Sequence, residues 1–170
     1  MSEGKYYGKY RGVVLNNIDP MQTGRIQVQV PDVLGVGISS WAMPCVPFAG
    51  IQSGIYTVPQ VGSGVWVEFE QGDHDYPIWV GGFWGSAAEV PALALAGLPV
   101  SPSIVLQTGS QNTVMLSDLP GPTGGILLKS TTGALISITE IGITISNGQG
   151  ATIMLTGPMV SINQGALTVV

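Results

Sequence analysis

The stretch Ile136–Leu155 reads ISITEIGITISNGQGATIML, and its pattern predicts the architecture of the second half of the chain. Within it, aliphatic residues occupy alternate positions in short runs. Ser and Thr fill most of the positions between them, and turns containing Gly separate the runs. Such alternation is typical of short β-strands with one apolar face and one polar face.

The same unit recurs along the whole tail of the chain. Aliphatic residues at positions i and i+2 form eight successive pairs, spaced by 10, 12, 10, 7, 10, 7 and 7 residues. The pairs are Ile104/Leu106, Val114/Leu116, Ile126/Leu128, Ile136/Ile138, Ile143/Ile145, Ile153/Leu155, Val160/Ile162 and Leu167/Val169. Each unit predicts a strand of about five residues followed by a tight turn.

One aliphatic face per strand raises the question of what covers that face. A single-chain solenoid encloses its core with coils of roughly 20 residues or more, and the observed steps are shorter. We therefore expect an intertwined trimeric β-helix, a β-prism needle in which the aliphatic faces of three chains meet on a three-fold axis. The predicted axis residues are Ile136, Ile138, Ile143, Ile145, Ile153, Leu155, Val160 and Ile162.

The first half of the chain differs in composition, because all 12 aromatic residues lie between Tyr6 and Trp84. Aromatic residues supply much of the buried area of an ordinary core, so this half is expected to form a compact domain with an aromatic core. Five strand-like segments occur within it, namely Arg11–Leu15, Arg25–Val30, Trp41–Val46, Val65–Glu70 and Ile78–Phe83. Five short antiparallel strands suggest a small Greek-key barrel of the OB type.

The predicted organisation is therefore all-β and has four parts. Residues 1–9 form a polar arm, residues 10–85 the OB-fold barrel, residues 86–103 a linker and residues 104–170 the trimeric β-helix. The linker is rich in Ala and Pro and is expected to be extended, with a short helix at Ala92–Ala96 as the alternative.

Composition excludes several classes of protein. Charged residues make up 9% of the chain, and the net charge is −5, which opposes binding to nucleic acid. The single cysteine rules out an intrachain disulfide framework. The apolar run Val90–Val100 is too short to span a bilayer, and the N-terminus has no hydrophobic signal segment, so assembly in the cytoplasm is expected.

A few residues are candidates for chemistry. Glu68 and Glu70 could act as paired carboxylates, but alternation on a strand makes them a solvated face. Asp73, His74 and Asp75 are competent metal ligands, although consecutive residues on a turn seldom converge on one ion. Cys45 is expected to be a buried small hydrophobic residue. We predict no catalytic, cofactor or metal site, and hence no enzyme.

The only basic cluster lies near the N-terminus, where Lys5, Lys9 and Arg11 are interleaved with Tyr6, Tyr7 and Tyr10. One hypothesis makes this a stacking platform for oligonucleotides, with the β-tail as an oligomerisation device. The acidic total favours the other hypothesis, in which the arm docks on a neighbouring protein. A third hypothesis, a solenoid hydrolase or adhesin, is disfavoured because only Asp118, Lys129 and Glu140 are charged after Glu89.

Three segments carry a resemblance to a known family. They read YRGVVLNNIDPMQTGRIQVQVPDV, WAMPCVPFAG and GIYTVPQVGSGVWVEFEQGDHDYPIWVGGFWG. Between Tyr6 and Gly85 the chain resembles the OB-fold domain of contractile-tail spike proteins, the phage baseplate assembly protein V and VgrG-like spikes. The tail is similar to the trimeric β-helix needle of that family.

The resemblance implies a structural homotrimer that sits under the tail tube and pierces the target envelope when the sheath contracts. Its implied partners are a hub or tube-initiator protein, baseplate wedge components, a PAAR-type tip protein and, transiently, the target membrane. The implied location is a virion baseplate or a contractile injection particle. We expect hub docking through Tyr6, Tyr7, Lys9 and Tyr10, and tip-protein docking through Leu167, Thr168, Val169 and Val170.

Two departures from family members refine this expectation. The 18-residue linker leaves no room for the lysozyme domain that some spikes carry between barrel and needle. His74 is the only histidine, so the chain cannot form the His-x-His iron site found at the tip of other spikes.

Overall fold

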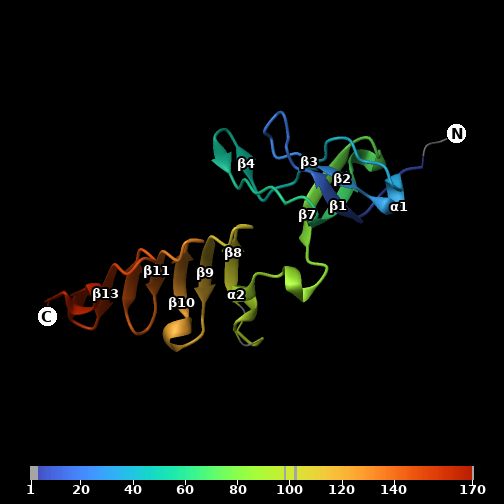
Figure 1. The fold of residues 1–170 in the computed structure, drawn as a ribbon. Coiled ribbons are helices and arrows are strands. Elements are labelled where there is room, and N and C mark those ends of the chain that lie inside the picture. The colour runs from blue at the N-terminus through green and yellow to red at the C-terminus, as the bar shows by residue number, and fades with distance from the viewer. Residues whose placement is uncertain (1–3, 98, 102, 170) are drawn as a thin grey trace. The chain divides into compact units, whose positions relative to one another are not determined.

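The computed structural model describes residues 4–97, 99–101 and 103–169 of the chain. It is all-β with a few short helices, and it divides into two compact units, Met1–Ala87 and Ala88–Val170. Figure 1 shows the curled sheet of the first unit and the ladder of strands of the second.

The first unit is built on a curled, OB-like half-barrel sheet. Its strands are β1 (Tyr10–Asn16), β2 (Gln27–Gln29), β3 (Met43–Pro44), β6 (Gly64–Phe69) and β7 (Pro77–Phe83), in the order β2-β1-β6-β7-β3. An antiparallel bridge between Ile26 and Ala42 joins the segments that precede the two edge strands. This bridge explains how a five-stranded sheet curls back toward itself.

Short helices and a hairpin complete this unit. They are α1 (Pro31–Leu34), β4 (Ala49–Gly50), β5 (Ser53–Gly54) and the 3₁₀ turn η1 (Glu70–Gly72). The β4–β5 hairpin was not predicted, because two-residue strands carry almost no alternation signal. The expectation that all barrel strands are antiparallel was wrong, since β3 pairs with β7 in parallel.

The core of the first unit follows the predicted alternation but is less aromatic than expected. Ile26, Val28 and Val30 are fully buried, and so are Val65 and Val67 of β6. Phe69 and Trp79 are the aromatic side chains that join this core among the described residues. The interior of a small barrel is narrow, so β-branched residues fill most of it and the other rings lie nearer the surface.

The second unit is an eight-stranded antiparallel meander in chain order. Its strands are β8 (Ile104–Gln107), β9 (Thr113–Ser117), β10 (Gly125–Lys129), β11 (Leu135–Ile138), β12 (Ile143–Ser146), β13 (Thr152–Thr156), β14 (Met159–Ile162) and β15 (Leu167–Val169). Each of the eight aliphatic pairs lies in one of these strands. The prediction of eight strand–turn units is therefore confirmed.

The segment between the two sheets contains helical turns rather than the extended chain that we expected. The turns are η2 (Ala87–Glu89) and α2 (Ala92–Leu95). Two further 3₁₀ turns, η3 (Gly121–Thr123) and η4 (Asn163–Gly165), lie within the strand meander. The alternative helix at Ala92–Ala96 was therefore the better prediction.

Candidate functional site

The most distinctive surface of the chain is one face of the tail sheet, where strand register aligns the aliphatic pairs into two rows. Ile126 of β10 lies opposite Leu116 of β9 and Ile138 of β11, and Leu128 lies opposite Val114 and Ile136. The same pairing continues to the end of the sheet. One row is 104, 116, 126, 138, 143, 155, 160, 169 and the other is 106, 114, 128, 136, 145, 153, 162, 167. We call them together the aliphatic face.

The register of the tail strands depends on side-chain alternation and on glycine where two strands lie close together. Side chains alternate between the two faces of a strand, so a slip of one residue would move a whole pair to the opposite face. Gly125, at the start of β10, has φ +83°, and a Cβ atom there would lie 1.9 Å from the carbonyl oxygen of Ile138. Glycine at this point lets β10 and β11 pair closely enough to keep the rows aligned.

Within one chain the aliphatic face is uncovered. Side chains in these rows are 37–67% exposed at twelve positions, among them Ile104, Leu106, Ile145 and Ile153. Exposed apolar surface on this scale marks an interaction site in a soluble protein. The eight predicted axis residues all lie in the two rows, and three of them, Ile143, Val160 and Ile162, are half-buried already.

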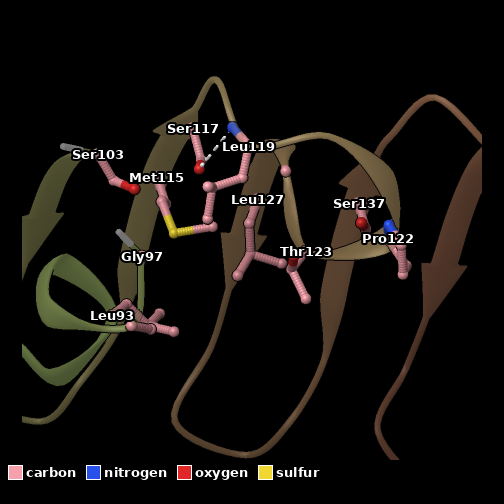
Figure 2. Close-up of a pocket in the computed structure, with 12 residues that line it drawn as sticks. Leu93, Gly97, Ser103, Met115, Ser117, Leu119, Pro122, Thr123, Leu127 and Ser137 are labelled. Carbon is pink, nitrogen blue, oxygen red and sulfur yellow. Dashed lines mark hydrogen bonds between the residues drawn. The ribbon is translucent and has the colours of Figure 1, made fainter. Parts of the chain in front are cut away.

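The opposite face of the sheet is partly covered by the chain itself, around β9. Thr113, Met115 and Ser117 of β9 are 5–8% exposed, although two of them are polar. Leu93 of α2 and Leu119 lie over this side. Figure 2 shows them around a cavity of ≈ 270 Å³ together with Met115, Leu127 and Ser137. The chain thus covers the part of this face around β9, whereas Met154 of β13 and Met159 of β14, on the same face, stay exposed.

In the first unit, the structure identifies a buried ion pair between Asp19 and Arg25, in the loop between β1 and β2. The Asp19 side chain is 3% exposed, and its carboxylate accepts hydrogen bonds from Nη2 of Arg25 at 2.6 Å and from the backbone N–H of Thr23 at 2.9 Å. The Arg25 guanidinium, with the backbone N–H groups of Met21 and Thr23, holds the pKa of Asp19 well below its usual range. Asp19 in turn raises the pKa of Arg25.

This ion pair organises the loop between β1 and β2 rather than an active site, because the hydrogen bonds to the Asp19 carboxylate come from Met21, Thr23 and Arg25 of that loop. The Arg25 guanidinium also lies over the Trp41 ring, which ties the loop to the segment before β3. An Asp followed by Pro, with Thr and Arg shortly after it, was the available signal. Asp side chains often bind backbone N–H groups two residues ahead in such turns.

The predicted N-terminal docking residues divide into two kinds. Tyr6 and Tyr10 pack against the core, with ring centroids 6.2 and 5.6 Å from that of Phe69. Tyr7 is 70% exposed, and the Lys9 ammonium pairs with the Glu68 carboxylate. The guanidinium of Arg11 lies over the rings of Trp66 and Phe83. These contacts occupy most of the groups that an oligonucleotide platform would need.

The remaining candidates for chemistry are engaged locally. Ligand atoms of Asp73, His74 and Asp75 lie within 4.8 Å of one another, which is close for consecutive residues on a turn. Nδ1 of His74 is 3.0 Å from Oδ1 of Asp75, and Asp73 accepts a hydrogen bond from the backbone N–H of Asp75. Cys45, directly after β3, is exposed rather than buried, because the alternation of β3 continues to it: Met43 and Cys45 are exposed, and Pro44 between them is half-buried.

The predicted tip-docking residues lie at or beyond the last strand. Leu167 is 55% exposed and belongs to one aliphatic row, and Val169 lies in the other by register. Thr168 lies between them in β15, while Val170 falls outside the described residues. None of the helices in the described part of the chain is long and apolar enough to cross a membrane.

Comparison with known proteins gives two family matches that together cover most of the chain. Residues 10–84 match the model of the type VI secretion system/phage-baseplate injector OB domain. Residues 103–168 match the model of the phage baseplate V C-terminal trimerisation domain. Both models describe structural baseplate domains rather than enzymes. A search of curated proteins finds no match.

Proposed function

Because the chain joins an injector OB domain to a baseplate V trimerisation domain, it belongs to the phage baseplate V family of spike and baseplate proteins, and we propose that it is a trimeric piercing spike. The observation that carries the proposal is the aliphatic face, which extends over all eight tail strands and has no cover within the described part of the chain. Three copies of this face can cover one another.

In the proposed needle, three tail sheets form a triangular prism whose interior consists of the two aliphatic rows of each chain. Strands of one sheet already pair with their chain neighbours. Trimerisation therefore adds side-chain packing along the axis, a simpler arrangement than the intertwined wrapping expected from the sequence. Burying the exposed part of twelve aliphatic side chains contributes roughly 0.5–1 kcal/mol each, on the order of 10 kcal/mol per chain.

The proposed mechanism is mechanical. When the sheath of a contractile tail or injection system shortens, the spike is driven against the target envelope and must resist buckling. A continuous hydrogen-bonded meander on each side of a dry axis supplies lateral stiffness, and interiors at close-packed density deform little. We place the barrels toward the hub, reached in part through Tyr7, and the last strand toward a PAAR-type tip protein.

The test replaces one axis residue and one residue of the opposite face of the same strand. Ile145→Asp would place three carboxylates on the proposed axis, where an unpaired charge is strongly unfavourable, so we expect it to abolish the trimer. Thr144→Asp places the charge on the other face, and we expect it to remain trimeric. Light scattering gives the mass, and SDS electrophoresis without boiling gives the resistance of the trimer.

Ile145 is 42% exposed in the single chain, so the Asp variant disturbs the isolated sheet little. A trimeric Ile145→Asp variant, or a monomeric unaltered protein, would contradict the proposed axis.

A further inference from the structure

A second apolar surface lies on the first unit and has no role in the needle. The sequence from Ala42 to Val67 contains no charged residue and no histidine. The β4–β5 hairpin forms within it and stands out from the curled sheet (Figure 1). Every residue from 47 to 57 is exposed, and Ile51, at the turn of the hairpin, is 97% exposed.

This hairpin has little to stabilise it within its own chain. Its two strands are two residues long, and the pairs Ala49–Gly54 and Gly50–Ser53 are their whole register. A lone two-stranded hairpin is marginally stable in water, and one that exposes more than half of Phe48 and Tyr56 and nearly all of Ile51 gains little from burial. The apolar side chains are explained if a partner covers them.

The same surface also offers a recess. A groove of ≈ 580 Å³ lies along the base of the hairpin. One wall is formed by Met43, Pro44 and Val46 with Gly24 of the β1–β2 loop, and the other by the hairpin itself, from Phe48 to Tyr56. Gly24 has φ +82°, and a Cβ atom there would lie 3.5 Å from the Tyr56 ring, which is an ordinary contact, so Gly24 and Tyr56 lie close together in the lining. One chain thus carries both an apolar projection and an apolar recess.

A second copy of the chain is the occupant that these features favour. A cyclic trimer needs two different complementary patches on each copy, because every contact around a three-fold axis joins unlike surfaces. Each chain has a net charge of −5, and a contact made through the uncharged segment 42–67 brings no like charges together. The tail keeps the barrels of one trimer near each other, which raises their effective concentration to about the millimolar range.

We propose that in the trimer the tip of each β4–β5 hairpin, at Ile51, inserts into the groove beside the hairpin of the next copy. Three such contacts close a ring of barrels. The proposal rests on the trimer of the proposed function, and it adds a second interface that is independent of the aliphatic face. The ring gives the hub a three-fold platform instead of three separately tethered barrels.

The native Cys45 provides a direct test, because it is exposed and lies between Pro44 and Val46 of the groove lining. In an Ile51→Cys variant, the proposed contact brings the introduced thiol of one copy near Cys45 of the next, within reach of a short bismaleimide. A link within one copy leaves a monomer band, so only links between copies produce larger species. We expect the reagent to move most of the protein into covalent dimer and trimer bands on a boiled gel.

Two controls define the contact. The Ile51→Cys/Cys45→Ser double variant should lose the cross-link, and equal cross-linking there would mean that hairpin tips meet each other and would overturn the groove assignment. Val36→Cys, at a position that is 93% exposed, should leave Cys45 uncoupled. Equally strong cross-linking of that variant would show that the reagent reports proximity alone and would also overturn the assignment.

Light scattering before cross-linking separates this proposal from the trimer itself. If the protein is a trimer but gives no covalent dimer or trimer bands, the hairpin contact is overturned. The same holds if the peptide map shows only a link within one copy. Neither result affects the proposed spike. A monomer overturns the proposed spike, and the hairpin proposal with it. Cross-linking that persists on dilution places the contact within one trimer, whereas cross-linking that disappears assigns it to collisions between trimers and counts against the proposal.

Discussion

Asp19 shows how one residue holds a loop that the sequence presents only as a turn. Its carboxylate is buried beside Arg25 and accepts backbone hydrogen bonds from Met21 and Thr23. The adjacent Gly24 accepts a hydrogen bond from Nε1 of Trp79 through its carbonyl oxygen at 3.1 Å. The loop is therefore tied to the core of the barrel, and the ion pair couples its shape to pH.

The pH dependence of the barrel follows from the lowered pKa of Asp19. Because the folded state favours the carboxylate, the ion pair contributes stability above the unfolded pKa of about 3.9 and loses it as the pH falls further. We expect Asp19→Asn to lower the thermal midpoint at pH 7 by several degrees, since an amide presents donors where Arg25 and Thr23 also donate. The difference in thermal midpoint between Asp19→Asn and the unaltered protein should shrink below about pH 4.

Tryptophan fluorescence is the suitable measurement, because all four Trp residues lie in the first unit. Asp32→Asn is the control, since Asp32 is exposed at the start of α1. If the difference in thermal midpoint between Asp19→Asn and the unaltered protein stays constant from pH 7 to pH 3, the ion pair is not the source of that difference.

At the scale of elements, strands with an aliphatic pair at i and i+2 were predicted. The eight aliphatic pairs of the tail correspond to eight strands, because an i, i+2 pair is enough to define the face of a strand flanked by turns. The β4–β5 hairpin was not predicted, because its strands contain only Ala, Gly and Ser and so have no aliphatic alternation. The parallel pairing of β3 with β7 depends on the long connection from Cys45 to Ser63, whose path is not encoded locally.

The last two strands, β14 and β15, allow a separate prediction about the end of the proposed needle. Deleting Ser161–Val170 removes β15 and half of β14, and leaves β8 to β13 with both aliphatic rows. We expect the truncated protein to remain a trimer and to lose binding to a PAAR-type tip protein, because the terminal strand edges that it would dock on are gone. Pull-down with the tip protein, alongside light scattering, checks both parts.

Gln149→Ala, in the exposed turn before β13, is the matched control and should keep tip binding. Retention of tip binding by the truncated trimer would show that the docking surface lies elsewhere.

For the whole molecule, the two units differ in how they achieve a core. Residues 4–87 enclose Val14, Ile26, Val28, Val65 and Val67 without help from another chain. The tail sheet leaves its most apolar face outside. The barrel is therefore expected to fold alone, and the tail to depend on its copies.

A fragment of residues 1–87 tests this division. We expect it to fold cooperatively and to be a monomer at micromolar concentration, whereas the full chain is a trimer. The hairpin contact does not change this expectation, because without the tail the barrels lose their high effective concentration. Light scattering and near-ultraviolet circular dichroism, which reports the aromatic barrel, are the measurements. A trimeric fragment would move the source of oligomerisation from the tail to the barrel.

The sequence by itself determined the all-β class, the eight strand units of the tail and the aliphatic residues of each, because alternation is a local property of the chain. It also carried the resemblance that the family matches bear out. Only the tertiary structure decided which face each unit buries, how the pairs align into two rows, and which exposed hairpin lies beside a groove. These features depend on register and on long connections, and they arise where residues far apart in the chain come together.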